Sequence, residues 1–476
     1  MTRPRWLLLG VAVVVLVGLA AADRVARPDA ARDDAIIVAS AMPTAAPEDA
    51  IASTWFCAGG SAQAGSDADA TVVIANPTRT EIVASVLAMP LEGDPVSVPV
   101  AVPPLARRTV RLGDLVTAPY VGATVDLKGG GAVVEQLVTG RGGTSATPCA
   151  ATGSDRWYFA DGSTAREDTM LLALYNPFPE DSIVDLAFST EQGRAVPSDF
   201  QGIVVRGGRL AVVNVGDHVR RRERVATTVR ARTGRVVAFR QQLRGATPRG
   251  TSVSLGAPSL GEEWWFVEGF VTAGVAERFS VSNPGDREAV VSVELVIDGE
   301  PIEPFDLTVP PRDRVDVIAS DEERVPKDQP HSTVVRSLNG VPVVAERSLA
   351  AGAPSGRNGR SETLGARRAA TRWVFAAGSA TEAADQWMSV LNPGTTPAHV
   401  SFTALAEGQP LAIDGLQDVE VPGGRRIAFR IGDHVQREDL PLLVESLGGP
   451  VVVERALYGV GAASPGVSLA FGVPLR

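Results

Sequence analysis

The stretch Trp157–Thr164 reads WYFADGST, and variants of it occur four times along the chain. The other copies are WFCAGGS from Trp55, WFVEGF from Trp265 and WVFAAGSAT from Trp373, at successive spacings of 102, 108 and 108 residues. A catalytic serine has no reason to occur four times, and the third copy carries Phe270 where the others have a hydroxyl. We therefore interpret the stretch as architecture, a buried strand bearing Trp that ends in a tight turn at glycine.

Three further landmarks follow each copy at nearly constant distances. An Asn-Pro pair comes first, and because Asn closes turns and Pro cannot donate to a sheet, it marks the end of a strand. A Gly-Asp pair follows in units one, two and four, whereas the third unit reads VIASDE there. A valine pair then leads into polar positions. We predict that these recurring residues are structural: Trp55, Trp157, Trp265, Trp373, Asn76, Asn176, Asn283, Asn392, Asp114, Asp217 and Asp433.

Between the landmarks the side chains alternate with a period of two. In SIVDLAFST, residues Val184, Leu186 and Phe188 fall on one face of a strand, and no unit contains a convincing amphipathic helix. We predict an all-β fold of four tandem β-sandwich (Ig-like) repeats of about 105 residues after an N-terminal membrane helix. The alternative is a closed, propeller-like arrangement, because AIIVASAMP near the start resembles VSLAFGVPL at the end and the two ends could share a strand.

The predicted domain organisation follows from these landmarks. Residues 1–22 form a signal anchor or transmembrane helix, and residues 23–54 form an extracytoplasmic stalk with a possible strand at 35–43. The four repeats are repeat 1 (55–150), repeat 2 (151–258), repeat 3 (259–366) and repeat 4 (367–476).

The N-terminus predicts the location of the body. Arg3 and Arg5 precede the uncharged run Trp6–Ala22, whose 17 residues suit an anchor in the cytoplasmic membrane with the rest of the chain outside the cytoplasm. Ala20–Ala22 also fits a cleavage site before Asp23, which would give a secreted protein. The formal net charge of −10 does not favour nucleic acid as a partner.

The chain has two cysteines, Cys57 and Cys149, which lie near the entrance and the exit of repeat 1. An exported body is in an oxidising setting, and a sandwich brings its opening and closing strands together. We predict a structural disulfide between them. A redox pair is usually more closely spaced, and a zinc site needs more ligands.

The sequence carries no recognised catalytic motif, so we predict no catalytic residue, metal ligand or cofactor. We interpret the four histidines as hydrogen-bonded structural residues and the Gly-Asp aspartates as turn caps. Glu346 and Glu454 recur at equivalent places, which we interpret as cross-strand ion pairs or rim positions. A glycosidase would need two carboxylates about 5–10 Å apart. The histidines are His218, His331, His399 and His434.

Residues shared by all repeats should be structural, so function should lie where the repeats differ. Trp264 and Trp387 are outside the repeated pattern, and an exposed Trp can serve as a sugar platform or a protein hot spot. Packing in a core or at a junction is the alternative for both. The loops Arg220–Arg224 and Ser355–Glu362 are further candidates.

The repeats resemble a family of uncharacterised exported actinobacterial proteins built from W-[YF]-F-A-x-G-S-T … N-P units. The resemblance spans roughly residues 50–476 and rests on Trp157–Thr164, Asn176-Pro177, the Gly-Asp motifs and the cysteines. It implies an envelope location in proximity to cell-wall glycan assembly, and it supplies no catalytic residues. Repeat 3 departs from the pattern, since it has FVEGF and no Gly-Asp.

The resulting hypothesis is a non-catalytic, membrane-anchored envelope protein that acts as a scaffold or binds a cell-wall glycan or an envelope protein. The first alternative is an enzyme acting on envelope polysaccharide, with its site at a junction between repeats. The second alternative is a mechanical spacer.

Overall fold

The computed structural model describes residues 42–63, 65–297, 301–460 and 466–476. Ala41–Arg476 forms one compact unit. The predicted membrane segment 1–22, the stalk up to residue 41 and most of the possible strand 35–43 lie outside the described residues, and Met42 and Pro43 are not in a strand. The helices among the described residues are too short or too polar to cross a bilayer.

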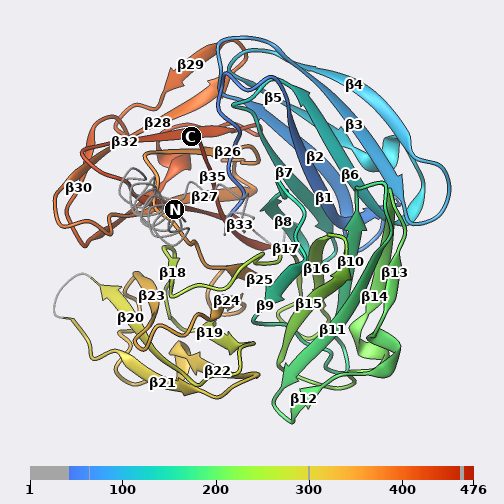
Figure 1. Ribbon diagram of the computed structural model, residues 1–476. Helices are drawn as coiled ribbons and strands as arrows, with labels where there is room; N and C mark the ends of the chain where they lie inside the picture. Colours follow the sequence, from blue (N-terminus) through green and yellow to red (C-terminus); the bar gives the residue numbers. More distant parts are fainter. Residues whose placement is uncertain (1–41, 64, 298–300, 461–465) are drawn as a thin grey trace, which may run out of the picture. The chain divides into compact units, whose positions relative to one another are not determined.

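The predicted all-β class is confirmed, and strands alternate with turns in every repeat (Figure 1). The alternation is visible in burial, since Val184, Leu186 and Phe188 are buried while Ile183, Asp185 and Ala187 are partly exposed. Repeat 1 contains β1 (Ser53–Ala62), β2 (Asp69–Asn76), β3 (Ile82–Pro90), β4 (Val96–Val102), β5 (Ala106–Arg111), η1 (Leu112–Asp114), β6 (Ala118–Lys128), β7 (Val133–Gly140) and β8 (Gly143–Pro148). Repeat 2 contains β9 (Arg156–Phe159), β10 (Thr169–Asn176), β11 (Ser182–Thr190), β12 (Gly193–Ala195), η2 (Ser198–Phe200), β13 (Ile203–Val205), β14 (Arg209–Asn214), η3 (Val215–Asp217), β15 (Val225–Thr233), β16 (Val237–Arg244) and β17 (Gly250–Leu255).

Repeats 3 and 4 follow the same order of elements. Repeat 3 contains β18 (Glu263–Phe266), β19 (Val275–Asn283), β20 (Ala289–Ile297), β21 (Phe305–Val309), β22 (Asp313–Ile318), η4 (Ala319–Asp321), β23 (His331–Ser337), β24 (Val344–Ala351) and β25 (Gly359–Leu364). Repeat 4 contains β26 (Arg372–Phe375), β27 (Ala384–Leu391), β28 (Ala398–Ala406), β29 (Gln409–Ala412), β30 (Val419–Val421), β31 (Arg426–Arg430), η5 (Ile431–Asp433), β32 (Leu442–Leu447), β33 (Val452–Gly459), β34 (Val467–Phe471) and β35 (Val473–Pro474).

Each repeat has an inner and an outer set of strands, in a sandwich-like pair. The inner sheet of repeat 2 has the order β14-β10-β16-β17, and its outer sheet runs β12-β11-β15-β9. The matching inner sheets are β22-β19-β24-β25 in repeat 3 and β31-β27-β33-β34 in repeat 4. In repeat 1 the corresponding sets are joined into one sheet, because β1 and β2 pair in parallel at Ser61 and Asp69.

The last inner strand of each repeat contacts the last inner strand of the next. β8 contacts β17, β17 contacts β25, β25 contacts β34, and β34 contacts β8 again. Figure 1 shows β8, β17 and β25 together at the centre of the four repeats. The cycle of contacts corresponds to the alternative sequence prediction, a closed arrangement, rather than to a row of independent domains.

A motif that the sequence analysis missed accounts for this closure. A Gly-x-Ser motif stands at the start of the last inner strand of each repeat, β8, β17, β25 and β34. Ser145, Ser361 and Ser468 in these motifs each accept a hydrogen bond from a backbone N–H of the following repeat. The glycines allow the backbones to approach, since a Cβ at Gly359 would lie 2.6 Å from the backbone nitrogen of Val467. The motifs begin at Gly143, Gly250, Gly359 and Gly466.

The two ends of the described body also meet. The backbone N–H of Ala45 donates to the carbonyl of Pro474, and the carbonyl of Ala46 accepts from Gly131 in repeat 1. Pro474 lies in β35, which pairs with β26 of repeat 4. The N-terminal segment therefore fastens repeat 4 to repeat 1.

Candidate functional site

The recurring Trp residues are buried in the repeat cores, and the structure corrects one of them. Trp157, Trp264 and Trp373 each donate an indole N–H to a backbone carbonyl, at 2.8, 3.0 and 2.9 Å. Trp264 is fully buried, so it occupies the repeat position that the sequence alignment gave to Trp265. Trp264 is therefore not a surface contact. Trp265 instead packs, half-buried, against the core of repeat 4.

The four Asn-Pro asparagines have one structural task. Each side chain is buried, and its amide donates to the carbonyl four residues on and to the end of a strand in the other sheet. The amide of Asn176, for example, donates to Glu180 and Val205, at 2.7 and 3.0 Å. These side chains join the two sheets at the turn. The residues are Asn76, Asn176, Asn283 and Asn392.

The Gly-Asp motifs form short 3-10 turns whose aspartates are exposed. Asp114 and Asp433 lie 3.9 and 3.5 Å from arginines three residues earlier, and Asp217 accepts from Asn214 at 2.9 Å. Repeat 3 keeps this turn as η4, which ends at Asp321 with Ser320 in place of glycine. Repeat 3 therefore lacks the Gly-Asp pair, as its sequence shows, but keeps the turn and the aspartate.

At three junctions between repeats, a buried Arg–Glu pair holds the loop after the Trp strand. Arg240 of repeat 2 lies 2.6 Å from Glu346 of repeat 3, and both side chains are fully buried. Arg240 also donates to the carbonyl of Asp161, whose own N–H donates to Glu346 at 2.9 Å. The other two pairs are Arg347 with Glu454, and Arg455 with Glu135.

Glu346 and Glu454 are thus in ion pairs, but their partners come from the preceding repeat and they do not lie at a rim. Burial raises the pKa of Glu346 and of Glu454, and the neighbouring guanidiniums only partly oppose this. Each arginine also lies over the Phe of the Trp strand, at 5.4 to 5.5 Å from the ring centre. The repeated charges therefore lie inside the junctions, where each pair links two neighbouring repeats.

The junction between repeats 1 and 2 replaces all of these groups. Gln136 stands at the arginine position and Phe239 at the glutamate position. The core is continuous across this junction, whereas repeats 3 and 4 have their own clusters. Phe56 of repeat 1 packs against Tyr175 and Phe178 of repeat 2, with ring centres 6.4 and 6.2 Å apart.

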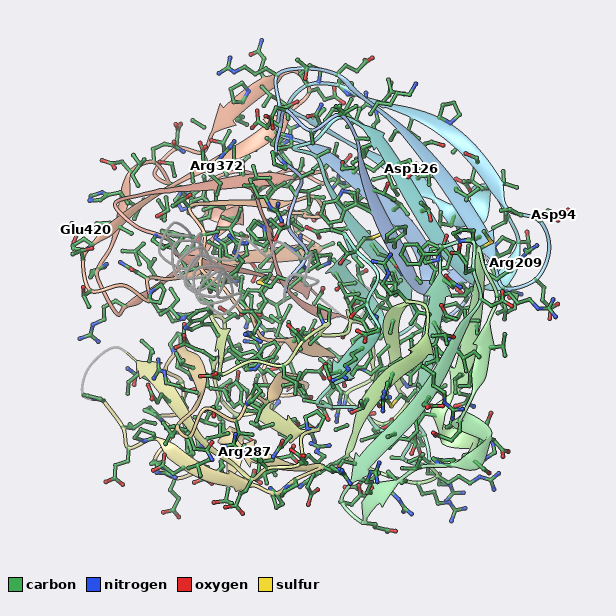
Figure 2. All side chains as sticks on the ribbon, viewed as in Figure 1. Asp94, Asp126, Arg209, Arg287, Arg372 and Glu420 are labelled. Carbon is green, nitrogen blue, oxygen red and sulfur yellow. A yellow bond between two sulfur atoms is a disulfide. The ribbon has the colours of Figure 1, made fainter. Side chains whose placement is uncertain are left out.

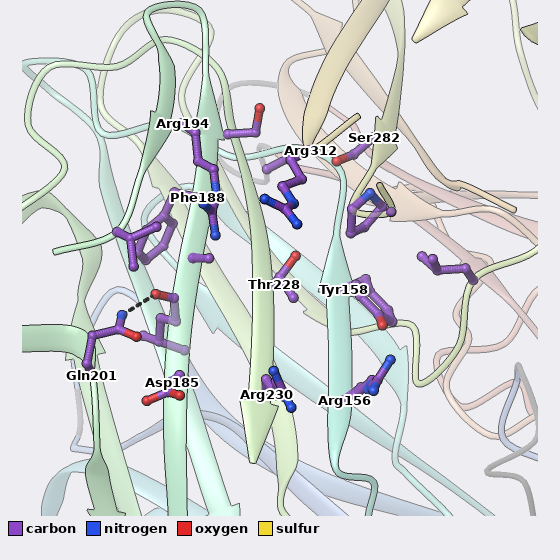
Figure 3. Close-up of a pocket in the computed structure, with 18 residues that line it drawn as sticks. Arg156, Tyr158, Asp185, Phe188, Arg194, Gln201, Thr228, Arg230, Ser282 and Arg312 are labelled. Carbon is purple, nitrogen blue, oxygen red and sulfur yellow. Dashed lines mark hydrogen bonds between the residues drawn. The ribbon is translucent and has the colours of Figure 1, made fainter. Parts of the chain in front are cut away.

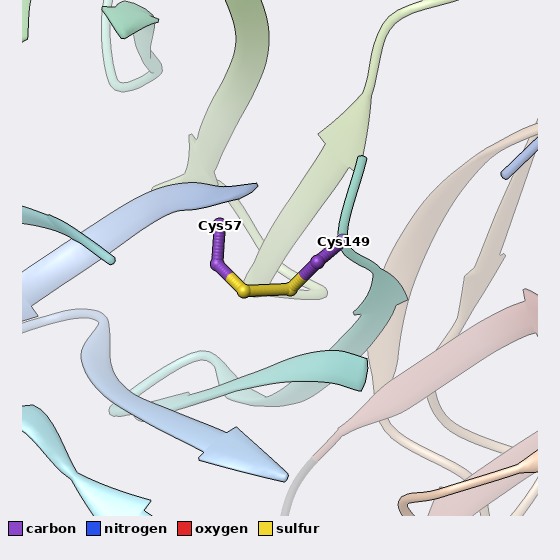
Figure 4. Close-up of a disulfide and its surroundings, with 2 residues drawn as sticks. All are labelled: Cys57 and Cys149. Atoms are coloured by element: carbon purple, nitrogen blue, oxygen red, sulfur yellow. A yellow bond between two sulfur atoms is a disulfide. The ribbon is translucent and has the colours of Figure 1, made fainter. Parts of the chain in front are cut away.

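The predicted disulfide between Cys57 and Cys149 is confirmed, with 4.8 Å between the Cα atoms (Figure 4). Cys57 stands where the other repeats have the Phe below the arginine, and Cys149 stands where they have glycine. A Cβ at one of these glycines, Gly256, would lie 2.8 Å from the ring of Phe159. The disulfide therefore occupies the space that a Phe packed on a Gly occupies elsewhere.

The histidines lie apart from one another. His331 is buried 2.6 Å from Glu277, while the other three lie near the surface in repeats 2 and 4. His218 is 3.4 Å from Asp199 and His399 is 3.2 Å from Asp418. His434 contacts the carbonyl of Asp414 at 2.8 Å.

The remaining candidates, Trp387 and the two loops, are engaged in different ways. Trp387 is half-buried, donates to Asp385 at 2.9 Å and packs near the junction of repeats 3 and 4. Residues 359–362 of the predicted loop Ser355–Glu362 belong to β25, and Arg357, just before this strand, lies over the ring of Tyr458 at 3.6 Å. In the loop Arg220–Arg224, Arg224 pairs with Asp316 of repeat 3 at 3.1 Å. Trp387 and residues of both loops therefore make contacts at or near the boundaries between repeats.

A cavity of about 450 Å³ lies between the outer sheet of repeat 2 and the turns of repeat 3 (Figure 3). Its wall in repeat 3 includes Ser282 and Gly285, which are equivalent to Tyr175 and Phe178 of repeat 2. At the preceding junction those two aromatic side chains fill the equivalent space. At the junction of repeats 2 and 3 these positions hold small residues, which leave this space open.

The lining of the cavity is rich in guanidinium groups. Figure 3 shows Arg194 and Arg312 at one end, Arg156 and Arg230 at the other, and Thr228 and Tyr158 between them. The lining contains a single carboxylate, that of Asp185. Burial alone would raise the pKa of Asp185, but hydrogen bonds from Arg232 and Gly202 lower it. The sequence analysis did not identify this site, although the cross-repeat differences that form it are visible in the sequence.

Three solved structures are similar to parts of this chain. Thermotoga maritima 1070 is 21% identical over 23% of this chain and 97% of its own, with a TM-score of 0.21. An Anabaena sensory rhodopsin transducer is 29% identical over 19% of this chain and 83% of its own, with a TM-score of 0.17. A tetra-tandem repeat from the extending region of a large adhesion protein is 10% identical over 89% and 100%, with a TM-score of 0.11. TM-scores this low support no structural argument.

No curated protein matches the sequence at a significant level. Residues 131–357 match a family described as a family of unknown function (DUF5719), and this stretch contains repeat 2, most of repeat 3 and the cavity between them.

Proposed function

We propose that this protein is a non-catalytic scaffold of the cell envelope, which binds cell-wall glycan at the cavity between repeats 2 and 3. One observation carries the proposal. The polar residues common to the repeats are engaged in turns and junctions, whereas the cavity is lined by Arg156 opposite Arg230, a like-charge pair that the other three repeats do not have at this position.

The disulfide supports a location outside the cytoplasm, because such bonds persist in oxidising compartments. Anchoring through residues 6–22, or secretion after cleavage near Ala22, remains part of the proposal on the basis of the sequence. Both forms present the described body to the envelope.

The enzyme alternative calls for close carboxylates from two repeats. Carboxylates of two repeats do come together at two junctions. Asp161 lies near Glu346, Asp168 and Glu362 both pair with Arg244, and Glu277 and Glu454 both lie within 4 Å of Arg347. These side chains are at most 9% exposed, and each contacts a guanidinium. The cavity itself is lined by one carboxylate, Asp185, whereas glycoside hydrolysis uses two. Binding without catalysis is therefore the function that this geometry supports best.

The test is retention of the purified full chain on three envelope fractions: peptidoglycan, its attached polysaccharide and a membrane-protein extract. We expect saturable retention on a glycan fraction. Retention on the protein extract alone would replace the glycan assignment with a protein scaffold, and release of soluble sugar from the polysaccharide would establish the enzyme alternative.

A further inference from the structure

The outer sheet of repeat 2 breaks a charge pattern that the other three repeats keep. In those three repeats the residue before the Trp faces a complementary partner on the neighbouring strand. Thr54 donates to Asp126 at 2.7 Å in repeat 1. Glu263 pairs with Arg336 at 2.6 Å in repeat 3, and Arg372 pairs with Glu445 at 3.1 Å in repeat 4. In repeat 2 the same register places Arg156 directly opposite Arg230. Like charges opposite each other destabilise an antiparallel pair, so this pair is a local cost to the fold.

Nearby carboxylates compensate these arginines only in part, since the charge of Asp185 interacts with Arg230 but its hydrogen bonds go elsewhere. Asp185 lies opposite Arg230 in the sheet, but its oxygens accept from Arg232 at 2.7 Å and from the N–H of Gly202 at 2.8 Å. The carboxylate nearest to Arg156 is that of Asp155, at 4.0 Å. Across the described ranges, no carboxylate lies within 4 Å of the guanidinium of Arg194, Arg230 or Arg312.

Arg312 adds a second departure from the repeat pattern. Its φ is +57°, in the left-handed region, and the equivalent positions are Leu105 in repeat 1 and glycines in repeats 2 and 4, Gly208 and Gly424. A long side chain is strained in that conformation, and such strain gathers at sites where function maintains it. Here it brings a fourth guanidinium to the cavity wall.

We propose that the cavity binds an acidic saccharide, whose carboxylate or phosphate groups are held by the pair Arg156 and Arg230 at one end and by Arg194 and Arg312 at the other. This inference deepens the proposed glycan-binding function and rests on it for the cell-wall context. Guanidinium forks match oxyanions in two-point geometry, and two guanidiniums on adjacent strands can share one anion.

The middle of the cavity favours a sugar over an acidic peptide. Tyr158 and Thr228 lie between the two arginine pairs, and Ser282 and Gln201 add further polar groups to the wall. Tyr158 is only 6% exposed, so the middle of the cavity presents mainly hydroxyl and amide groups, which suit a polyol, and the volume is within the range of small-ligand pockets.

The experiment is calorimetric titration of the full chain with four probes at 20 mM and 200 mM salt. The probes are trigalacturonate, glucose 1-phosphate, neutral galactotriose and the peptide triglutamate. We expect trigalacturonate or glucose 1-phosphate to bind, with affinity falling at high salt because the contacts are ionic. Whichever of these two binds identifies the oxyanion as carboxylate or phosphate.

Two variants restore what the other repeats have at these positions. Arg230→Glu recreates the opposite-charge pair of repeat 4, and Arg312→Gly recreates the turn residue of repeats 2 and 4. We expect each to lower the affinity for the acidic probe at least tenfold while the melting temperature stays equal or rises. Arg206→Glu, an exposed site on repeat 2 outside the cavity lining, is the matched charge control and should bind normally.

Three results would overturn the inference: no binding of either acidic sugar, equal binding of galactotriose, or unchanged affinity in both cavity variants. Tighter binding of triglutamate would reassign the site to an acidic peptide. If the chain is retained on glycan but Arg230→Glu is retained equally, the inference fails while the proposed function stands. If an acidic probe binds in the cavity but no envelope fraction retains the chain, the proposed function fails instead.

Discussion

At the scale of single residues, the junctions between repeats are filled by two different sets of buried side chains. At three junctions a buried guanidinium lies on a Phe ring and pairs with a glutamate of the next repeat, as Arg455 does with Glu135. At the fourth junction Gln136 and Phe239 take these places and a disulfide takes the place of the ring. Buried ion pairs are often exchangeable for apolar groups of similar volume, so both sets should be stable.

This exchange can be tested at the junction of repeats 4 and 1. We expect Glu135→Ala to cost about 3–5 kcal/mol of unfolding free energy, because it leaves the buried charge of Arg455 without its partner. The double variant Glu135→Phe with Arg455→Gln copies two of the three groups of the junction of repeats 1 and 2, keeps Phe375, and should recover most of that loss. Urea unfolding of the three proteins measures the recovery. A double variant no more stable than Glu135→Ala would show that the two sets are not interchangeable.

Asp161 predicts a pH dependence. Burial alone would raise the pKa of Asp161, but the guanidiniums of Arg278 and Arg314 from repeat 3 hold it below its usual value. A carboxylate with a lowered folded pKa contributes stability above the unfolded pKa of about 3.9, and that stability is lost as the pH falls towards the folded value. The junction of repeats 2 and 3 should therefore weaken in acid.

We expect Asp161→Asn to be less stable than the parent protein at pH 7 and the difference to narrow below about pH 4. Melting curves from pH 7 to pH 2.5 provide the measurement, with Asp94→Asn, an exposed site (Figure 2), as the control. A gap that stays constant over this range would rule out the assigned role of the carboxylate.

The residue scale also shows why one Trp was placed incorrectly. The sequence EEWWFVEGF offers two adjacent Trp residues, and alignment by spacing alone cannot choose between them. Burial does choose, because the strand's alternation directs Trp264 into the core and Trp265 towards repeat 4. The turn of repeat 3 was missed for a similar reason. Its sequence has Ser320 in place of the glycine, and only the backbone geometry shows that Asp321 ends the same turn.

At the scale of elements, the disulfide joins β1 to the exit of β8 and so holds both ends of repeat 1. Reduction, or Cys57→Ser with Cys149→Ser, should cost about 4 kcal/mol, because the bond closes a long loop. Cys57→Phe with Cys149→Gly, which copies repeats 2 to 4, should be more stable than the serine pair. Denaturant unfolding with and without reductant measures both, and a serine pair as stable as the parent would contradict the prediction.

The strands were predictable from the sequence, but the Gly-x-Ser starts of β8, β17, β25 and β34 were overlooked. Short motifs of Gly and Ser look like turns in one sequence, and their role depends on neighbouring repeats that contact one another only after closure. The cavity could not be predicted from the sequence for a related reason. Its residues come from two repeats, and it becomes visible only when Ser282 and Gly285 are compared with Tyr175 and Phe178 in space.

At the scale of the whole molecule, closure makes the C-terminal strand a structural element of the entire body. Removal of Gly472–Arg476 would delete β35, its pairing with β26 and the hydrogen bond from Ala45. We expect this truncation to lower the melting temperature by more than 5 °C, whereas removal of Arg476 alone, which is exposed, should have little effect. Differential scanning calorimetry distinguishes the two, and equal melting temperatures would show that the fastening is dispensable.

The contact between Ala45 and Pro474 has a consequence for how the protein could be labelled or loaded. A row of four repeats would grow longer with each repeat, but here the start and the end of the described body are neighbours. Fluorophores attached at both places should show strong energy transfer in the native state. A pulling force applied there would act first on this contact, and while it holds, the body adds little reach as a spacer.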